Sequence, residues 1–115
     1  NTVMAGALVA SKMDIKVGHV EAGLRSYDRT MPEEINRIVT DHVSDYLFAP
    51  TQKQADILKS EAIEAEKIFV TGNTVVDAVM EGFEIAQRKS NVLETLGLQE
   101  GKYILMTSHR PATVD

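Results

Sequence analysis

Three polar clusters follow short apolar runs, and they hold the residue types best suited to chemistry. The clusters are residues 19–26, 71–74 and 108–110. Their carboxylates can move a proton or stabilise a cation, and their Arg, His and backbone N–H groups can hold an anion. If the apolar runs are parallel strands, the clusters meet at the edge of the sheet where ligands of open α/β folds bind.

The two leading carboxylates also have purely structural interpretations. Glu21 can be a loop carboxylate held by Arg25. Glu33 fits the fourth position of a capping box that begins at Thr30, and it can pair with Arg37 one helical turn later. Taken singly, neither residue separates catalysis from structure.

Other possible sites give weaker signals. His42 falls on the apolar face of its helix, which favours packing in the core. Residues 71–73 resemble a phosphate-binding turn, but glycine-containing turns before helices are common. The spacing of His, Asp and Glu predicts no metal site, and the sequence contains neither a P-loop nor a nucleophile elbow. No cofactor is expected.

The spacing of apolar residues predicts alternating strands and helices. The expected helices cover residues 2–13, 32–45, 52–60 and 75–89, with a helical turn at 91–98, and the expected strands cover 15–20, 46–49, 67–70 and 103–107. The first helix is expected to be well buried. The strands are too apolar for one face of the sheet to be exposed to solvent. The prediction is therefore an α/β fold: a parallel sheet with helices on both faces.

Composition narrows the class of protein. The 115 residues carry a net charge of −5 and include no cysteine and no tryptophan. A nucleic-acid surface would need clustered Lys and Arg, and no stretch has the ~20 apolar residues of a membrane helix. We expect a cytoplasmic protein that binds neither nucleic acid nor membrane. An anionic small ligand remains compatible with local clusters of Arg and His.

The motifs together resemble the non-hydrolysing UDP-N-acetylglucosamine (UDP-GlcNAc) 2-epimerase family. The matching segments, in order, are His19–Arg25, Pro32–Glu34 with Asn36 and Arg37, Pro50–Thr51, Thr71–Ala78 and His109–Arg110. One such motif is weak, but the ordered set runs along nearly the whole chain. The resemblance implies a GT-B architecture, in which two Rossmann-like domains enclose the substrate.

The resemblance also implies where this chain falls in that architecture. Residues 1–90 would be the later part of the N-terminal domain with its connecting helix, and residues 91–115 the linker and first strand of the C-terminal domain. The chain opens at Asn1 without an initiator methionine, so we expect an internal piece of a longer enzyme. Such a piece lacks the nucleotide-binding half and is expected to be inactive alone.

Family members interconvert UDP-GlcNAc and UDP-ManNAc by elimination and re-addition of UDP, and the full-length enzyme is expected to be a homodimer. The resemblance implies catalytic roles for Glu21, Glu33 and His109, and substrate binding by His19, Arg25, Arg37, Asn73 and Arg110. No metal or cofactor is implied.

One segment departs from the family pattern, and two alternative functions stay open. The family continues after His109–Arg110 with a variable residue, Glu, and Asn or Ser, where this chain has Pro111, Ala112 and Thr113. A substrate contact from that segment is therefore in doubt. The alternatives are a hydrolysing 2-epimerase, which releases free ManNAc and UDP, and a catalytically silent structural fragment.

Overall fold

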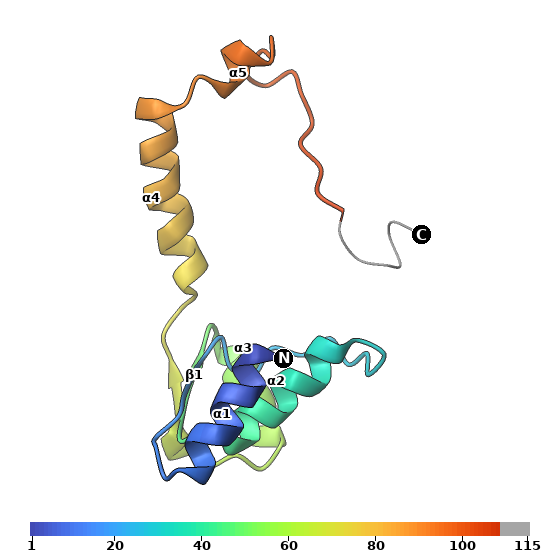
Figure 1. Cartoon of the computed structure of the whole chain (residues 1–115), viewed down its shortest axis with the longest axis vertical. Coiled ribbons are helices and arrows are strands. Elements are labelled where there is room, and N and C mark those ends of the chain that lie inside the picture. Colours follow the sequence, from blue (N-terminus) through green and yellow to red (C-terminus); the bar gives the residue numbers. More distant parts are fainter. Residues whose placement is uncertain (109–115) are drawn as a thin grey trace. The chain divides into compact units, whose positions relative to one another are not determined.

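The computed structural model describes residues 1–108, which divide between two compact units, residues 1–76 and residues from 77 onward. The first unit contains, in order, α1 (Thr2–Lys12), β1 (Gly18–Val20), α2 (Pro32–Val43), β2 (Tyr46–Ala49), α3 (Gln52–Ser60), a 3₁₀ turn (Ala65–Lys67) and β3 (Ile68–Val70) (Figure 1). Helix α4 (Thr74–Lys89) begins in the first unit and continues into the second, which also holds α5 (Val92–Thr95). None of these helices is long and apolar enough to span a bilayer.

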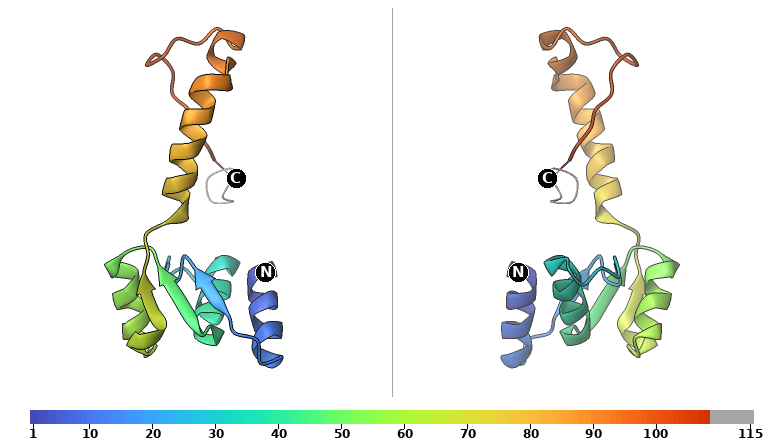
Figure 2. Two further views of the ribbon diagram at one scale, coloured as in Figure 1. Left: turned by 90° about the vertical axis from the view of Figure 1, so that its left-hand side faces the viewer. Right: turned by 90° about the vertical axis from the view of Figure 1, so that its right-hand side faces the viewer.

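The three strands form one parallel sheet in the order β1-β2-β3, as the sequence predicts. When each successive parallel strand is added on the same side of the preceding one, right-handed connections place the connecting helices on the same face of the sheet. The left view of Figure 2 shows α2 and α3 behind the strands, with α1 beside α2. The parallel α/β sheet is therefore confirmed, whereas residues 1–76 supply helices to only one of its faces.

Strand β2 alternates between the two faces of the sheet. Leu47 and Ala49 are fully buried, and they pack with Ala55 and Leu58 of α3. Alanine at two of these four positions lets helix and strand approach closely. On the other face, the ring of Phe69 lies 5.8 Å from that of Phe48, between centroids.

Helix α2 begins one residue away from the predicted capping box. Its N-cap is Met31 and Pro32 occupies the first turn, where the missing N–H costs no hydrogen bond. Thr30 does not cap the helix, because its hydroxyl and its N–H both donate to the carboxylate of Asp28. The predicted box between Thr30 and Glu33 is therefore wrong.

Two other predictions about apolar segments need correction. Helix α1 forms as predicted, but only Ala7 is buried along it, and Val3 and Val9 are more than half exposed. Residues 103–107 form no strand, and Ile104 is 95% exposed. A strand requires a neighbour that satisfies its backbone groups, and within residues 1–108 no segment pairs with this one.

Candidate active site after the first strand

Glu21 directly follows β1 in a left-handed conformation. Its φ angle is +64°, a region that non-glycine residues occupy at an energetic cost. The next residue, Ala22, donates its N–H to the carbonyl of Phe48 at 3.1 Å and is fully buried. The Glu21 side chain is exposed and forms no ion pair or hydrogen bond within residues 1–108. A strained backbone thus presents an unpaired carboxylate at the carboxyl end of the strand.

Gly23 is required for two independent reasons. Its φ angle is +79°, and a Cβ atom at this position would lie 2.6 Å from the carbonyl oxygen of Gln54. Its N–H donates to Oδ2 of Asp41 at 3.2 Å. The loop after β1 is therefore packed directly against α3 and bonded to α2.

Asp41 is a buried carboxylate that holds both sides of this loop. Its side chain is 0% exposed. Oδ1 lies 2.6 Å from Nδ1 of His19, and Oδ2 lies 2.7 Å from Nη1 of Arg25. Together with the Gly23 N–H, three groups of the segment between residues 19 and 25 bind one carboxylate.

Arg25 lies within this buried network, with a side chain only 1% exposed. Its Nε and Nη2 donate to the two carboxylate oxygens of Glu61, and Nη1 donates to the carbonyl of Leu24 at 2.8 Å. Burial disfavours the charge, but the hydrogen bonds to Glu61 and Asp41 outweigh burial and raise the pKa of Arg25 above its ordinary value. Arg25 therefore anchors the loop, and the alternative in which it pairs with Glu21 is wrong.

Glu34 at the start of α2 fixes the second part of the loop. Its carboxylate accepts the N–H groups of Ser26 and Tyr27 at 2.9 Å each, and the Ser26 hydroxyl at 3.0 Å. Burial favours the protonated carboxyl, but these hydrogen bonds and the charge of Arg25 prevail and lower the pKa of Glu34. The loop is thus bonded to the helix N-terminus, where a negative charge is also stabilised.

Glu33, the neighbouring residue, is exposed and forms no ion pair or hydrogen bond within residues 1–108. The predicted pair between Glu33 and Arg37 is not formed. Arg37 instead lies 3.6 Å from Oε2 of Glu34, one turn earlier on the helix. Glu33 is therefore the free carboxylate of the acidic pair that begins α2, and Glu34 is the structural one.

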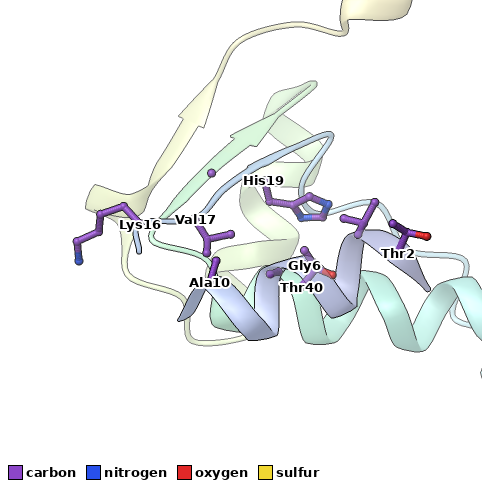
Figure 3. Close-up of a pocket in the computed structure, with 10 residues that line it drawn as sticks. Thr2, Gly6, Ala10, Lys16, Val17, His19 and Thr40 are labelled. Atoms are coloured by element: carbon purple, nitrogen blue, oxygen red, sulfur yellow. The ribbon is translucent and has the colours of Figure 1, made fainter. Parts of the chain in front are cut away.

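His19 lies in the middle of β1, beside a hollow of about 330 Å³ between the strand and α1. Figure 3 shows its ring between the ribbon of β1 and the α1 residues Thr2 and Gly6. Thr40 of α2 also lines the hollow. The ring is therefore held by Asp41 on one side and borders open space on another.

The remaining predicted site residues fall outside this cluster. Asn73 caps α4, since its Oδ1 accepts the N–H of Val75 at 2.9 Å. His42 was expected in the core but is exposed, with Nδ1 2.9 Å from the carbonyl of Ile38. His109 and Arg110 lie outside the described residues. Within residues 1–108, no group of His, Asp and Glu is arranged to hold a metal ion.

Sequence reasoning missed the structural role of the three carboxylates that hold this loop, namely Glu34, Asp41 and Glu61. One signal was present for two of them. Glu34, Arg37 and Asp41 are spaced by three and four residues, which places a charged stripe along one face of α2. Charged residues on one face of a helix either face solvent or pair with buried residues of opposite charge. Here Asp41 is buried and pairs with Arg25. Glu61 gave no such signal.

The parallel sheet and the polar loop after β1 define a Rossmann-like α/β domain, whose ligands bind at the carboxyl ends of the strands. The chain belongs to the UDP-N-acetylglucosamine 2-epimerase family, because the family model matches residues 1–115. The family resemblance found in the sequence is confirmed. The fold class is confirmed as well, since the solved structures that the chain superposes on are GT-B proteins of this family.

The sequences of individual relatives align with this chain over its whole length. The UDP-N-acetylglucosamine 2-epimerase of Methanocaldococcus jannaschii is 56% identical over 117 residues, which cover 100% of this chain and 32% of the relative. The UDP-2,3-diacetamido-2,3-dideoxy-D-glucuronate 2-epimerase of Pseudomonas aeruginosa is 46% identical, again with 100% and 32% coverage. The chain therefore spans about a third of the length of these curated relatives.

Solved structures lead to the same family. The M. jannaschii UDP-GlcNAc 2-epimerase in complex with UDP-GlcNAc and UDP superposes with a TM-score of 0.79 at 59% identity, over 84% of this chain and 26% of that one. A putative UDP-N-acetylglucosamine 2-epimerase from Listeria monocytogenes gives a TM-score of 0.81 at 36% identity, over 97% and 29%.

Proposed function

We propose that the full-length protein is a non-hydrolysing UDP-GlcNAc 2-epimerase, which interconverts UDP-GlcNAc and UDP-ManNAc. The proposal rests on family membership along the entire chain. The observation that carries it is the state of Glu21: a carboxylate at the carboxyl end of a strand, exposed, unpaired within residues 1–108 and held on a left-handed backbone. Its neighbours are fixed by hydrogen bonds, so its position is defined.

The reaction explains why carboxylates are needed. No carbonyl lies next to C2 of the sugar to acidify its proton, so the C1–O bond to the diphosphate loosens first and leaves a cationic ring. A carboxylate then stabilises the cation and removes the C2 proton, the C1–C2 double bond forms, and UDP departs with the electron pair of the broken bond. Re-addition delivers a proton to the opposite face of C2 and re-forms the C1–O bond.

Glu21 and Glu33 are assigned to these two tasks, without a choice between them. Both are exposed, and neither is used by the ion pairs that hold the loop. His109 is assigned to the diphosphate or to protonation of the leaving group. His19, Arg37, Asn73 and Arg110 are assigned to substrate binding. Arg25 was also expected to bind substrate, but its side chain is 1% exposed and faces Glu61, Asp41 and the Leu24 carbonyl, so we assign it to holding the loop instead.

The experiment is to incubate the full-length protein with UDP-GlcNAc in D₂O and to follow the products by NMR. UDP-ManNAc that carries deuterium at C2 is the expected product, because a carboxylate exchanges its proton with solvent. Glu21→Gln and Glu33→Gln should each lower kcat strongly, whereas Glu64→Gln, an exposed partner of Lys67, should not. Steady release of free ManNAc would replace this proposal with the hydrolysing reaction.

A second candidate differs only in the sugar. The P. aeruginosa relative, 46% identical to this chain, is described as a UDP-2,3-diacetamido-2,3-dideoxy-D-glucuronate 2-epimerase. The same elimination suits both sugars, because both are epimerised at C2. Comparing kcat/KM for the two nucleotide sugars decides between them, and a higher value for the diacetamido sugar would favour the second candidate.

Two further expectations follow from the family. Residues 1–115 alone should show no turnover, since they span about a third of the curated relatives. The full-length protein is expected to be a cytoplasmic homodimer. Light scattering after size exclusion checks the dimer, and measurable epimerisation by residues 1–115 would contradict the assignment of nucleotide binding to the remaining part.

A further inference from the structure

We propose that Asp41 is a positioning residue that sets the place of the Glu21 carboxylate, an inference that rests on the proposed function. Asp41 lies on α2, and its side chain is fully buried, so it acts on the reaction only through other groups. Neither the family motifs nor the candidate catalytic residues include it.

The partners of Asp41 lie on both sides of Glu21 in the sequence. Asp41 binds the His19 ring through Oδ1, and the Gly23 N–H and the Arg25 guanidinium through Oδ2. His19 and Gly23 lie two residues before and two residues after Glu21. One carboxylate therefore fixes both flanks of the residue that carries the proposed chemistry.

The backbone between those flanks is strained at Glu21. Ala22 is bonded to Phe48, and Gly23 is confined by the carbonyl of Gln54. Glu21 has no such bond of its own and adopts a φ angle of +64°. An isolated chain would relax from this conformation, because it costs roughly 1–2 kcal/mol for an L-residue. The bonds from Asp41 to the two flanks oppose that relaxation.

Positioning matters because proton removal depends on the distance between the carboxylate and C2. A displacement of about 1 Å can cost about 10²-fold in rate. Binding of the nucleotide does not depend on Glu21 in the same way. Loss of Asp41 is therefore expected to lower kcat more than it changes KM.

The chain offers a matched control in Asp45, which holds the other end of the same strand. Its carboxylate accepts Lys16 Nζ at 2.8 Å and the Val17 N–H at 2.9 Å. Asp41 and Asp45 thus each bind one cation and one backbone N–H beside β1. Only Asp41 lies next to the loop that carries Glu21.

The experiment compares Asp41→Ala, Asp41→Asn and Asp45→Ala in the full-length protein. Asp41→Ala should lower kcat by about tenfold or more. Asp41→Asn should rescue part of this loss, because one amide oxygen can still accept from Gly23 and Arg25. Asp45→Ala should leave kcat unchanged. Equal losses of kcat in the two alanine variants, or a loss confined to KM, would overturn the proposal.

A double-mutant cycle with Glu21→Gln tests whether Asp41 acts through Glu21. Once the Glu21 carboxylate is gone, Asp41→Asn should cost little further activity, whereas independent residues would multiply their effects. If the double variant is too slow to measure, a crystal structure of Asp41→Asn decides. A loop between residues 19 and 25 that has shifted supports the proposal, and an unchanged loop overturns it.

Failure of this proposal can be distinguished from failure of the proposed function. A wild-type protein without epimerase activity, or a Glu21→Gln variant with normal activity, contradicts the proposed function. Normal activity in the Asp41 variants, beside an inactive Glu21→Gln variant, contradicts the positioning role alone. If Asp41→Ala does not fold, Asp41→Asn carries both tests.

Discussion

Arg25 and Glu61 form a bidentate ion pair, in which Nε and Nη2 of the arginine lie 2.8 Å and 2.6 Å from the two carboxylate oxygens. The two residues are 36 positions apart. Glu61 follows the last residue of α3, so this pair joins the loop after β1 to the end of that helix. Planar two-point pairing of this kind fixes direction as well as distance.

Removal of Glu61 should therefore destabilise the protein markedly. In Glu61→Ala, Arg25 keeps Asp41 but leaves two N–H groups buried without acceptors. Breaking a buried pair costs roughly 3–5 kcal/mol, and we expect about 3 kcal/mol because the Glu61 side chain is 25% exposed. The measurement is urea-induced unfolding of the full-length protein.

Glu64→Ala is the matched control for this prediction. Glu64 pairs with Lys67 at 3.0 Å, but both side chains are exposed. Exposed pairs contribute about 0–1 kcal/mol, so this variant should unfold close to wild type. Equal destabilisation by Glu61→Ala and Glu64→Ala would contradict the buried anchor.

The elements of the fold were predictable because their signals are local. Strand β2 coincides with its prediction, and α3 covers the predicted residues because the spacing of its apolar residues is a local signal. Exposure was not predictable in the same way. Apolar spacing identifies α1 as a helix, but which residues become buried depends on partners elsewhere in the fold, and only Ala7 is buried.

The candidate site was predictable only where a motif marked it. Glu21 and Glu33 came from the family motif, and their roles remain predictions. The contacts that hold them did not come from the motif. Arg25 and Glu34 lie in the matching segments, but the bond between Arg25 and Asp41 joins positions sixteen apart that no sequence pattern connects. Local reasoning also paired Glu33 with Arg37, whereas burial of Glu34 against the loop makes that residue the partner.

Glu34 should make the stability of the protein depend on acid. Its pKa is lower in the folded protein than its ordinary value of 4.5, so the carboxylate contributes stability that is present above this value and is lost as the pH falls through the folded pKa. We expect urea midpoints to fall below about pH 4.5, and to fall less steeply in Glu34→Gln.

Ser26→Ala should weaken the acid dependence of stability that Glu34 causes, without abolishing it. It removes one of the three hydrogen bonds to Glu34 and leaves both backbone N–H groups in place. Its pH dependence should therefore lie between those of wild type and Glu34→Gln. Parallel curves for wild type and Glu34→Gln would show that the Glu34 carboxylate is not a source of the acid sensitivity.

The strained backbone of Glu21 predicts opposite effects on stability and activity. Glycine adopts a φ angle of +64° without steric cost, so Glu21→Gly should retain stability or gain up to about 1 kcal/mol. Its epimerase activity should be lost with the carboxylate. Thermal unfolding and NMR-monitored turnover of the full-length protein measure the two effects.

Ala62→Gly is the control for the backbone term alone. Ala62 has the same φ angle of +64° in the turn after α3, and its methyl group has no proposed role. Both glycine variants should therefore change stability alike, while only Glu21→Gly loses activity. A Glu21→Gly variant that unfolds far more easily than Ala62→Gly would mean that Glu21 holds the loop.

Gly23→Ala separates backbone strain from steric exclusion when it is compared with Gly72→Ala. Both glycines have positive φ angles, +79° and +85°, so an alanine at either position costs roughly 1–2 kcal/mol. At Gly72 the new Cβ meets nothing within 4 Å in the part of the chain that is described, whereas at Gly23 it lies 2.6 Å from the Gln54 carbonyl oxygen. Overpacking against the backbone adds roughly 1–3 kcal/mol, so Gly23→Ala should unfold at clearly lower urea concentration than Gly72→Ala.

The loop must move away from α3 to relieve the clash, so kcat of Gly23→Ala should fall as well. Equal urea midpoints for the two variants would show that the loop is not held against α3.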